Sequence, residues 1–131
     1  MAGIVERLFC KDPTSFNEVI DKATQDVDRK LFVLFTATKN PSTGLTWCPD
    51  CNVASPIIDE VLSKLTTPTT IVICDVDREP YRTSGYLYRV DPRINLRCVP
   101  TLLKWENGKG TLRLNDHESQ IPAAVNELFD S

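Results

Sequence analysis

The sequence predicts an α/β fold with a central mixed five-stranded sheet and helices on both faces. Strand-type and helix-type hydrophobic patterns alternate along the 131 residues, which is typical of strands joined through helices. Two of the strand patterns are continuously apolar, as expected of central strands that are covered on both faces. Residues 107–110, Asn-Gly-Lys-Gly, join two further short strands into a hairpin. The length fits a single domain over residues 1–131.

The first half of the chain contains two expected strands and two expected helices. The first strand covers residues 5–10, and Asp12-Pro13 then opens a helix. Its core-facing residues follow at helical spacing: Phe16, Val19, Ile20, Ala23 and Val27. The apolar strand 31–38 leads into a loop over residues 39–46, which contains Pro and Gly. A second helix follows Cys48 and is expected to bury Val53, Ala54, Ile57, Ile58, Val61, Leu62 and Leu65.

The second half contains three more strands and a final helix. Residues 70–76 form the second apolar strand, and the polar segment 78–97 is irregular with a helix expected at about 81–89. Residues 101–106 and 111–114 form the hairpin strands. The last helix begins at about Ser119 and is expected to bury Ile121, Ala124, Val125, Leu128 and Phe129. Strand–helix–strand crossovers make the first strand pairs parallel, and the hairpin adds an antiparallel edge.

Composition and charge exclude several classes of partner. The chain is 41% hydrophobic and 25% charged with a formal net charge of −3, so we expect neither a nucleic-acid partner nor a membrane partner, which would call for clustered Lys and Arg. The N-terminal residues 1–7 do not have the pattern of a signal peptide, which predicts a cytoplasmic protein. The five cysteines are an odd number, which argues against a secreted disulfide framework.

Cys48 and Cys51 form the motif that carries the expected chemistry. Two thiols separated by two residues, between a strand and a helix in a short chain, are typical of a redox-active disulfide centre. Cys48 lies at the expected helix N-terminus, where backbone N–H groups and the helix dipole stabilise a thiolate, so it is the predicted nucleophile. Cys51 is the predicted resolving thiol. We expect no bound cofactor.

A metal site is the alternative interpretation of the two thiols. A tetrahedral zinc site needs four ligands. The other candidates are Cys10, Cys74, Cys98 and His117, none of which forms a second closely spaced pair. The sequence therefore favours redox chemistry, with no metal.

Four stretches of the chain together resemble the thioredoxin fold. They are residues 47–51 (Trp-Cys-Pro-Asp-Cys) after the second strand, 55–61 with Pro56 inside the helix, 75–77 (Asp-Val-Asp) and 99–102 (Val-Pro-Thr-Leu). The resemblance implies that Pro100 follows a cis peptide bond and that the Val99 backbone binds an extended substrate beside the sulfurs. A trans proline at the start of an edge strand is the alternative.

A narrower resemblance is to the thioredoxin domain-containing protein 17 family. It rests on Phe35-Thr36, the loop 39–46, the Pro49-Asp50 pair between the cysteines, and residues 99–104. The resemblance implies a cytosolic disulfide reductase that is recycled by thioredoxin reductase and NADPH. It also implies protein disulfides, cystine, mixed disulfides and nitrosothiols as substrates, and links to a dynein light chain and to inflammatory signalling.

Asp50 is the residue at which the motif differs from ordinary thioredoxins. As a neighbouring carboxylate it would oppose a Cys48 thiolate, or it would accept a proton from Cys51 during resolution. A solvated carboxylate of small effect is the third interpretation. Ordinary thioredoxins carry a buried Asp in the preceding strand, and the equivalent position here is Leu34.

The remaining candidate residues have weaker assignments. Trp47 either covers the substrate-binding site and packs on the helix, or is a core residue. Cys98 is either a regulatory thiol near the sulfurs or an inert small residue, and we expect the latter. We expect Cys74 to be buried, Cys10 to be structural or incidental, and His117 to lie at the surface near a helix start.

The segment 78–97 raises a second hypothesis about function. Its tyrosines and arginines suggest a mixed polar surface, which either shapes substrate access or, as we expect, is a solvated face: Tyr81, Tyr86, Tyr88, Arg82, Arg89, Arg93 and Arg97. If this segment instead contacts a protein partner, the chain is a binding adaptor whose redox chemistry is incidental. A Cys48→Ser variant separates the two functions, because adaptor binding would survive it.

Overall fold

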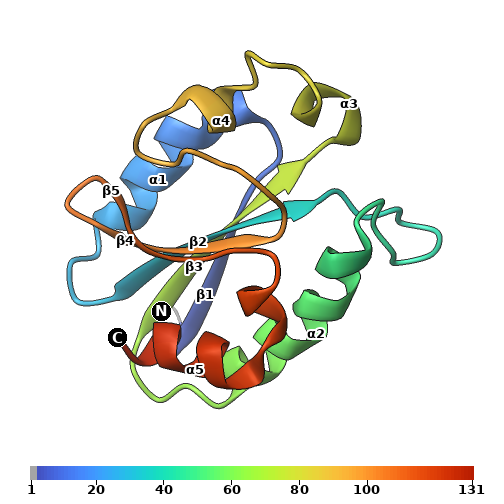
Figure 1. Ribbon diagram of the computed structural model, residues 1–131. Coiled ribbons are helices and arrows are strands. Elements are labelled where there is room, and N and C mark those ends of the chain that lie inside the picture. The colour runs from blue at the N-terminus through green and yellow to red at the C-terminus, as the bar shows by residue number, and fades with distance from the viewer. Residues whose placement is uncertain (1–2) are drawn as a thin grey trace.

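A central five-stranded sheet organises the computed structural model, which describes residues 3–131 (Figure 1). The strands are β1 Val5–Cys10, β2 Lys30–Ala37, β3 Thr69–Val76, β4 Thr101–Glu106 and β5 Lys109–Leu114. Their order is β1-β3-β2-β4-β5, with β3 parallel to both β1 and β2, and with β4 antiparallel to β2 and β5. The predicted mixed sheet, its parallel pairs and its antiparallel hairpin edge are therefore confirmed.

Helices cover both faces of the sheet, as predicted. They are η1 Pro13–Ser15, α1 Phe16–Thr24, α2 Pro49–Ser63, α3 Arg78–Tyr81, α4 Leu87–Val90, η2 Glu118–Gln120 and α5 Pro122–Asp130. Figure 1 shows α1, α3 and α4 above the sheet and α2 and α5 below it. Because a strand directs alternate side chains to opposite faces, each layer of helices packs on its own core.

The central strand β2 shows how the two cores are separated. Its Val33 and Phe35 belong to the cluster under α1 and α4, whereas Phe32 and Leu34 belong to the cluster under α2 and α5. All four side chains are buried. A strand that is buried on both faces has a continuous apolar sequence, which is why this strand was visible in the sequence.

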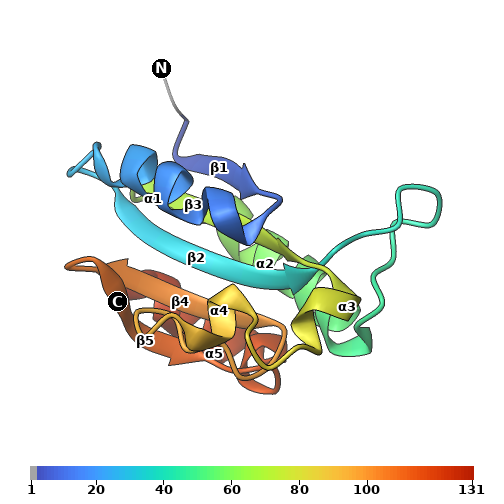
Figure 2. The same ribbon diagram turned by 90° about the horizontal axis from the view of Figure 1, so that it is seen from above.

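The carboxyl ends of the parallel strands position the candidate site. After β2 the chain enters a loop that Figure 2 shows projecting beyond the sheet, and it then returns to the start of α2. A bridge between Lys39 and Thr46 closes this loop at its base. The first turn of α2 therefore lies at the edge of the sheet where the parallel strands end, in agreement with the predicted loop 39–46.

Three residues that were expected in the core are exposed. α1 ends at Thr24, so Val27 lies in the following turn and is 87% exposed. Val53 is exposed on the outer side of α2. Ile121 is exposed because it precedes α5, which begins at Pro122. Proline suits the first turn of a helix, because its missing N–H has no partner to lose there.

The single helix predicted at 81–89 is wrong. Two one-turn helices, α3 and α4, flank a turn that contains Gly85. Tyr86 and Tyr88 are buried in the core under α1, so they do not form the expected solvated polar face. The ring of Tyr88 packs against the rings of Phe35 and Tyr86, at centroid distances of 4.8 and 5.5 Å, and this packing helps to hold the segment on the sheet.

Among residues 3–131, no helix has the length and apolar character needed to cross a membrane.

Candidate active site

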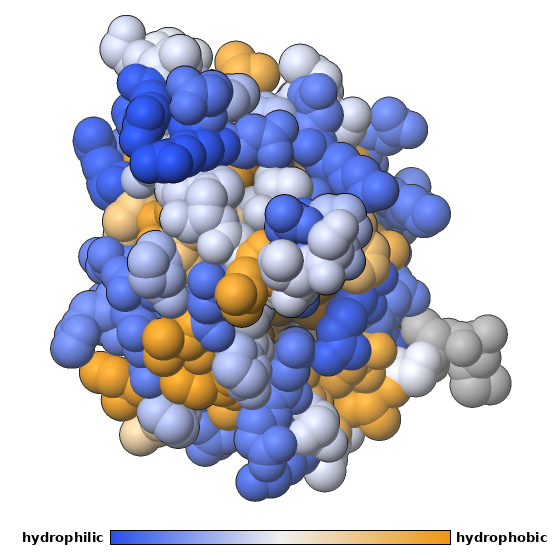
Figure 3. Space-filling model, turned by 90° about the vertical axis from the view of Figure 1, so that its right-hand side faces the viewer, coloured by the Kyte–Doolittle hydropathy of each residue, from blue (hydrophilic) through white to orange (hydrophobic). Residues whose placement is uncertain are grey.

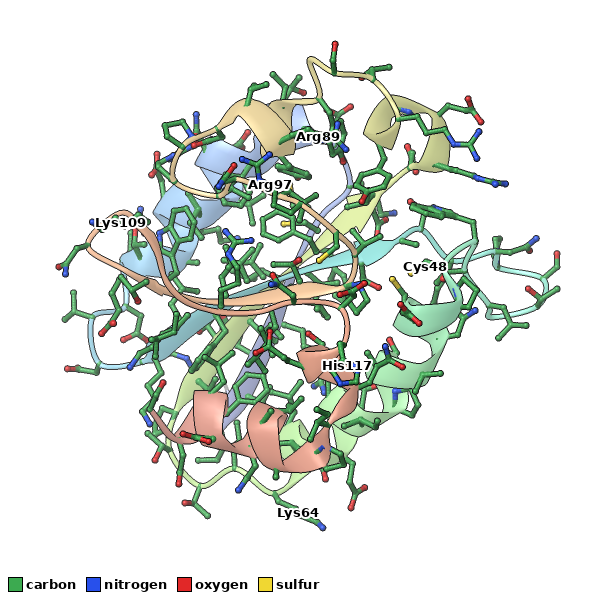
Figure 4. The ribbon with its side chains drawn as sticks, in the orientation of Figure 1. Cys48, Lys64, Arg89, Arg97, Lys109 and His117 are labelled. Atoms are coloured by element: carbon green, nitrogen blue, oxygen red, sulfur yellow. The ribbon has the colours of Figure 1, made fainter. Side chains whose placement is uncertain are left out.

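Cys48 is the residue that directly precedes α2. Its backbone is extended (φ −112°, ψ 107°), and its Sγ atom accepts a hydrogen bond of 3.1 Å from the backbone N–H of Cys51. A side chain that accepts from the first helical turn is an N-cap, and here a sulfur atom fills that role. Figure 4 shows Cys48 at the edge of the sheet, at the start of α2. The predicted placement of Cys48 at a helix N-terminus is confirmed.

Thr46 and Asn52 hold the chain that leads into Cys48, and neither residue was singled out from the sequence. The Thr46 hydroxyl accepts a hydrogen bond from the Cys48 N–H and donates one to the Cys48 carbonyl, both at 3.0 Å. The Asn52 side chain bonds both backbone groups of Thr46, at 2.8 and 3.2 Å. Their spacing around the cysteines, two residues before Cys48 and four after it, was the signal in the sequence for this brace.

The segment containing Val99 and Pro100 lies against the first sulfur. The Val99–Pro100 peptide bond is cis, as the resemblance implied. The Cys48 thiol donates to the Val99 carbonyl oxygen at 3.5 Å, although the two residues are 51 positions apart. The fold therefore brings together the two segments that were expected to form one exchange site.

Cys51 is buried with an exposed fraction of 1%, and Cys48 is also buried, at 6%. Burial, followed by its hydrogen bond and charge interaction with Cys48, raises the pKa of the Cys51 thiol from 9.0 to about 12. Hydrogen bonds with Ala37 and Thr36 lower this pKa by less. Cys51 is therefore a protonated thiol in the resting reduced protein.

Asp50 is half-buried in the first turn of α2, next to Pro49. No hydrogen bond or ion pair of its carboxylate is found among the described residues. Its predicted effect on the two thiols stays a prediction. Leu34 is buried against the helix layer that contains α2, so an apolar side chain occupies the strand position at which ordinary thioredoxins carry an acid.

Trp47 connects the site to the end of β3. Its indole Nε1 donates to the Val76 carbonyl at 3.0 Å, and its ring lies 5.7 Å from the ring of Tyr81 between centroids. The side chain is half-buried, so Trp47 is both a partial cover of the site and part of the core. A pocket of about 520 Å³ lies beside it, lined by residues of the loop. The surface on this side of the molecule has separate hydrophobic patches among hydrophilic residues (Figure 3).

The remaining candidate residues are the other three cysteines and His117. Cys74 is buried in β3, as predicted, and Cys10 is buried at the end of β1. Cys98 is half-buried with its Sγ 3.6 Å from the Thr101 hydroxyl. His117 is exposed. Within residues 3–131, no group of three or more His, Cys, Asp or Glu side chains could hold a metal ion.

Comparison with known proteins identifies the family of this chain. A family model described as thioredoxin domain-containing protein 17-like, thioredoxin domain, matches residues 10–131. The chain belongs to this family. Thioredoxin-like protein Clot of Arabidopsis thaliana is 38% identical over 99 residues, which cover 75% of this chain and 74% of that protein. Human thioredoxin domain-containing protein 17 is 33% identical over 94 residues, which cover 70% of this chain and 73% of the human protein.

Solved structures of thioredoxins show that this chain has the thioredoxin fold. Schistosoma mansoni thioredoxin aligns with a TM-score of 0.63 at 19% identity, covering 98% of this chain and 97% of the other. Thioredoxin O1 of Arabidopsis thaliana in its oxidised state aligns with a TM-score of 0.53 at 25% identity, covering 84% and 85%. The predicted fold and family are confirmed, and membership supports a general thiol oxidoreductase type of function.

The raised pKa of Cys51 predicts a pH dependence of stability. The folded state keeps the Cys51 proton up to about pH 12, whereas the unfolded chain loses it near pH 9, so the unfolded state binds fewer protons in this window. The free energy of unfolding of the reduced protein should therefore fall as the pH rises from about 9 towards 12. Urea unfolding at several pH values within this window measures it.

A Cys51→Ala variant should show a shallower fall than the wild type over the same pH range. Part of the fall should remain, because burial also raises the pKa values of Cys74 and Tyr86. Ser55→Ala is the matched control, since it changes a non-titrating residue of the same helix. Equal slopes for Cys51→Ala and the wild type would contradict the assignment.

Proposed function

We propose that this chain is a cytosolic thiol–disulfide oxidoreductase that reduces disulfides with Cys48 and Cys51. The observation that carries the proposal is the environment of the Cys48 sulfur. It lies between the Cys51 N–H at 3.1 Å and the Val99 carbonyl at 3.5 Å. A backbone N–H directed at a sulfur at the start of a helix can stabilise the thiolate that attacks a disulfide.

The reaction proceeds in two exchanges. The Cys48 thiolate attacks one sulfur of the substrate disulfide, the substrate S–S bond breaks, and the first substrate thiolate leaves. Cys51 then loses its proton and attacks the Cys48 sulfur of the mixed disulfide. The second substrate thiolate leaves, and two electrons have passed from the Cys48–Cys51 pair to the substrate.

The order of these steps follows from the coupling of the two thiols. Part of the rise in the Cys51 pKa comes from its hydrogen bond with Cys48 and from the Cys48 charge. When Cys48 enters a mixed disulfide it carries no charge, so this part disappears and Cys51 loses its proton more easily. Cys51 therefore stays protonated until Cys48 has formed a mixed disulfide with the substrate. Asp50 remains the candidate that accepts this proton.

The backbone of Val99 and the half-buried Trp47 are the proposed substrate contacts. An extended substrate segment beside Pro100 would pair with the Val99 backbone, as a short strand added next to the sulfurs. Residues of the segment 78–97 such as Tyr86 and Tyr88 are turned into the core. This packing favours the exchange chemistry over adaptor binding as the main function, and contact with a dynein light chain stays a prediction.

Recycling of the oxidised protein needs two electrons from outside. We propose thioredoxin reductase and NADPH as the source, with protein disulfides and small disulfides such as cystine as substrates. A coupled assay that follows NADPH oxidation in the presence of the reductase, this protein and cystine tests the source. No NADPH oxidation above the reductase alone would exclude this partner while leaving the chemistry of the pre-reduced protein open to direct measurement.

Trapping of the intermediate tests the assigned roles. We expect reduced Cys51→Ser, mixed with cystine, to accumulate a stable mixed disulfide on Cys48, because a serine hydroxyl cannot resolve it. Mass spectrometry of the tryptic peptide 40–64 detects the adduct and its position. In the wild type the adduct should be transient and give way to the internal disulfide.

Cys48→Ser is the matched control for the trapping experiment. It retains Cys51, which is buried and protonated, so it should form little adduct. An equal amount of adduct on Cys51 in this control, or no adduct in Cys51→Ser, would show that the roles of nucleophile and resolving thiol are assigned wrongly.

A further inference from the structure

Cys10 and Cys74 form a second pair of thiols, on the adjacent strands β1 and β3. The two strands are parallel, and the two cysteines are direct partners in the strand register. Both side chains belong to the core cluster that lies under α1 and α4. Neither residue takes part in the exchange chemistry proposed for Cys48 and Cys51.

The register alone brings the two cysteines within the span of a disulfide. Neighbouring strands lie about 4.8 Å apart. The Cα atoms of a disulfide are separated by about 4.4 to 6.8 Å. The two side chains also leave the sheet on the same face, because both belong to one cluster. A bond between the sulfurs therefore needs little movement of the backbone.

Three groups surround the Cys10 sulfur. The Cys10 thiol donates to the Asp12 carbonyl oxygen at 3.2 Å, and the Tyr88 hydroxyl lies 3.4 Å from the sulfur. The side-chain hydrogen bond with Cys74 is the largest contribution that lowers the pKa of Cys10 to about 6, whereas burial raises the pKa of Cys74. Cys10 is therefore the more acidic of the two thiols, and Cys74 stays protonated.

We propose that Cys10 and Cys74 are a second, peroxide-sensitive dithiol that closes into a disulfide between β1 and β3. The Cys10 thiolate attacks one oxygen of hydrogen peroxide, the O–O bond breaks, and Cys10 sulfenic acid and hydroxide form. The Cys74 thiol gives its proton to hydroxide and attacks the Cys10 sulfur. The S–S bond forms as the second oxygen leaves as hydroxide, which takes up from solvent the proton that Cys10 lost on ionising. The two sulfurs thus lose two electrons, and the peroxide becomes two waters.

The edge of the sheet gives the oxidant access to this pair. Both thiols are almost fully buried in the closed fold. However, β1 is an edge strand that is paired on one side only, and Cys10 is its last residue. Edge strands and strand ends open locally more easily than central strands, which gives hydrogen peroxide a route to the two thiols. Because the thiols react only after such an opening, their oxidation should be slower than that of an exposed thiol. The disulfide would then fix the edge strand to the central sheet.

Trypsin places Cys10, Cys74 and Cys98 in three different peptides, so each pairing among these three cysteines can be identified. Cys10 falls in peptide 8–11, Cys74 in 65–78, Cys98 in 98–104, and Cys48 with Cys51 in 40–64. The experiment uses the full chain with Cys48→Ser and Cys51→Ser, which removes the exchange site. The reduced protein is treated with hydrogen peroxide, its remaining thiols are alkylated in denaturant, and the digest is analysed without and with reductant.

We expect a cross-linked species of peptides 8–11 and 65–78 that disappears on reduction. It should be absent when Cys74→Ser is added and unchanged when Cys98→Ser is added. Because the first readout needs no substitution at either member of the pair, it does not depend on whether Cys74→Ser folds. The cross-linked protein should also have a higher urea midpoint than its reduced form, since the bond constrains the unfolded chain.

Two kinds of result would overturn the proposal. One is recovery of both peptides alkylated after prolonged treatment, or of Cys10 as sulfinic acid without a cross-link. The other is a link from Cys10 or Cys74 to peptide 98–104 in equal amount, which would indicate random pairing in opened chains. Each of these results is independent of the function proposed for Cys48 and Cys51.

Discussion

Cys48→Ser should lower the kcat/KM for disulfide reduction by a factor of at least about 10³, because the serine hydroxyl is not ionised near neutral pH and is a poor nucleophile towards sulfur. The substitution keeps the helix start intact, since serine is among the preferred N-cap residues and can accept the same Cys51 N–H. A loss of activity can therefore be assigned to the missing nucleophile and not to a damaged fold.

The measurement is best made with pre-reduced protein in a single turnover, which does not depend on the recycling partner. Cys98→Ser is the matched control: it removes a half-buried thiol two residues before Pro100 and leaves Cys48 in place. It should retain most of the wild-type activity. If Cys98→Ser lost as much activity as Cys48→Ser, the reaction would pass through Cys98 and our assignment would be wrong.

Phe35→Ala should be the most destabilising change in the core, with a loss of about 3 to 5 kcal/mol in the free energy of unfolding. Phe35 is fully buried in the central strand β2. Its ring centroid lies 4.8 Å from that of Tyr88 and 6.2 Å from that of Phe16. Its removal leaves a cavity between the sheet, α1 and the segment that contains α4.

Urea unfolding of the reduced protein measures this loss. Val27→Ala is the matched control, because Val27 is 87% exposed and its truncation should change the free energy by less than about 0.5 kcal/mol. If Phe35→Ala does not fold, Phe35→Leu should still fold, with a loss of less than about 1.5 kcal/mol for a smaller change of volume. A loss below about 1 kcal/mol for Phe35→Ala would show that this core rearranges to fill the cavity.

Much of the site could be predicted because its chemistry is local in sequence. Cys48 and Cys51 are three residues apart, and a helix that begins between them fixes their geometry whatever surrounds it. The strand β2 was equally visible, since a strand buried on both faces must be apolar throughout. The position of Val99 next to Cys48 was expected only from the resemblance to a known fold, because nothing in 51 residues of separation indicates contact.

The expectations that failed depended on where an element ends or what it packs against. Val27 follows the hydrophobic period of α1, but the chain turns before reaching it. Tyr86 and Tyr88 lie in a polar stretch of the sequence. Their rings are buried because they pack on the core cluster that contains Phe35, and this contact exists only in the folded chain. The Thr46 and Asn52 brace was missed because its hydrogen bonds form only after the loop has closed.

The sequence by itself determined the order of the five strands, the two apolar strands and the Cys48–Cys51 pair at a helix start. These depend on periodicity and on short-range geometry, which the chain carries locally. The tertiary structure decided how deeply Cys51 is buried and that Val99 lies beside Cys48. It also decided that Cys10 faces Cys74, because strand register is set by packing across the whole sheet and not by the residues of either strand alone.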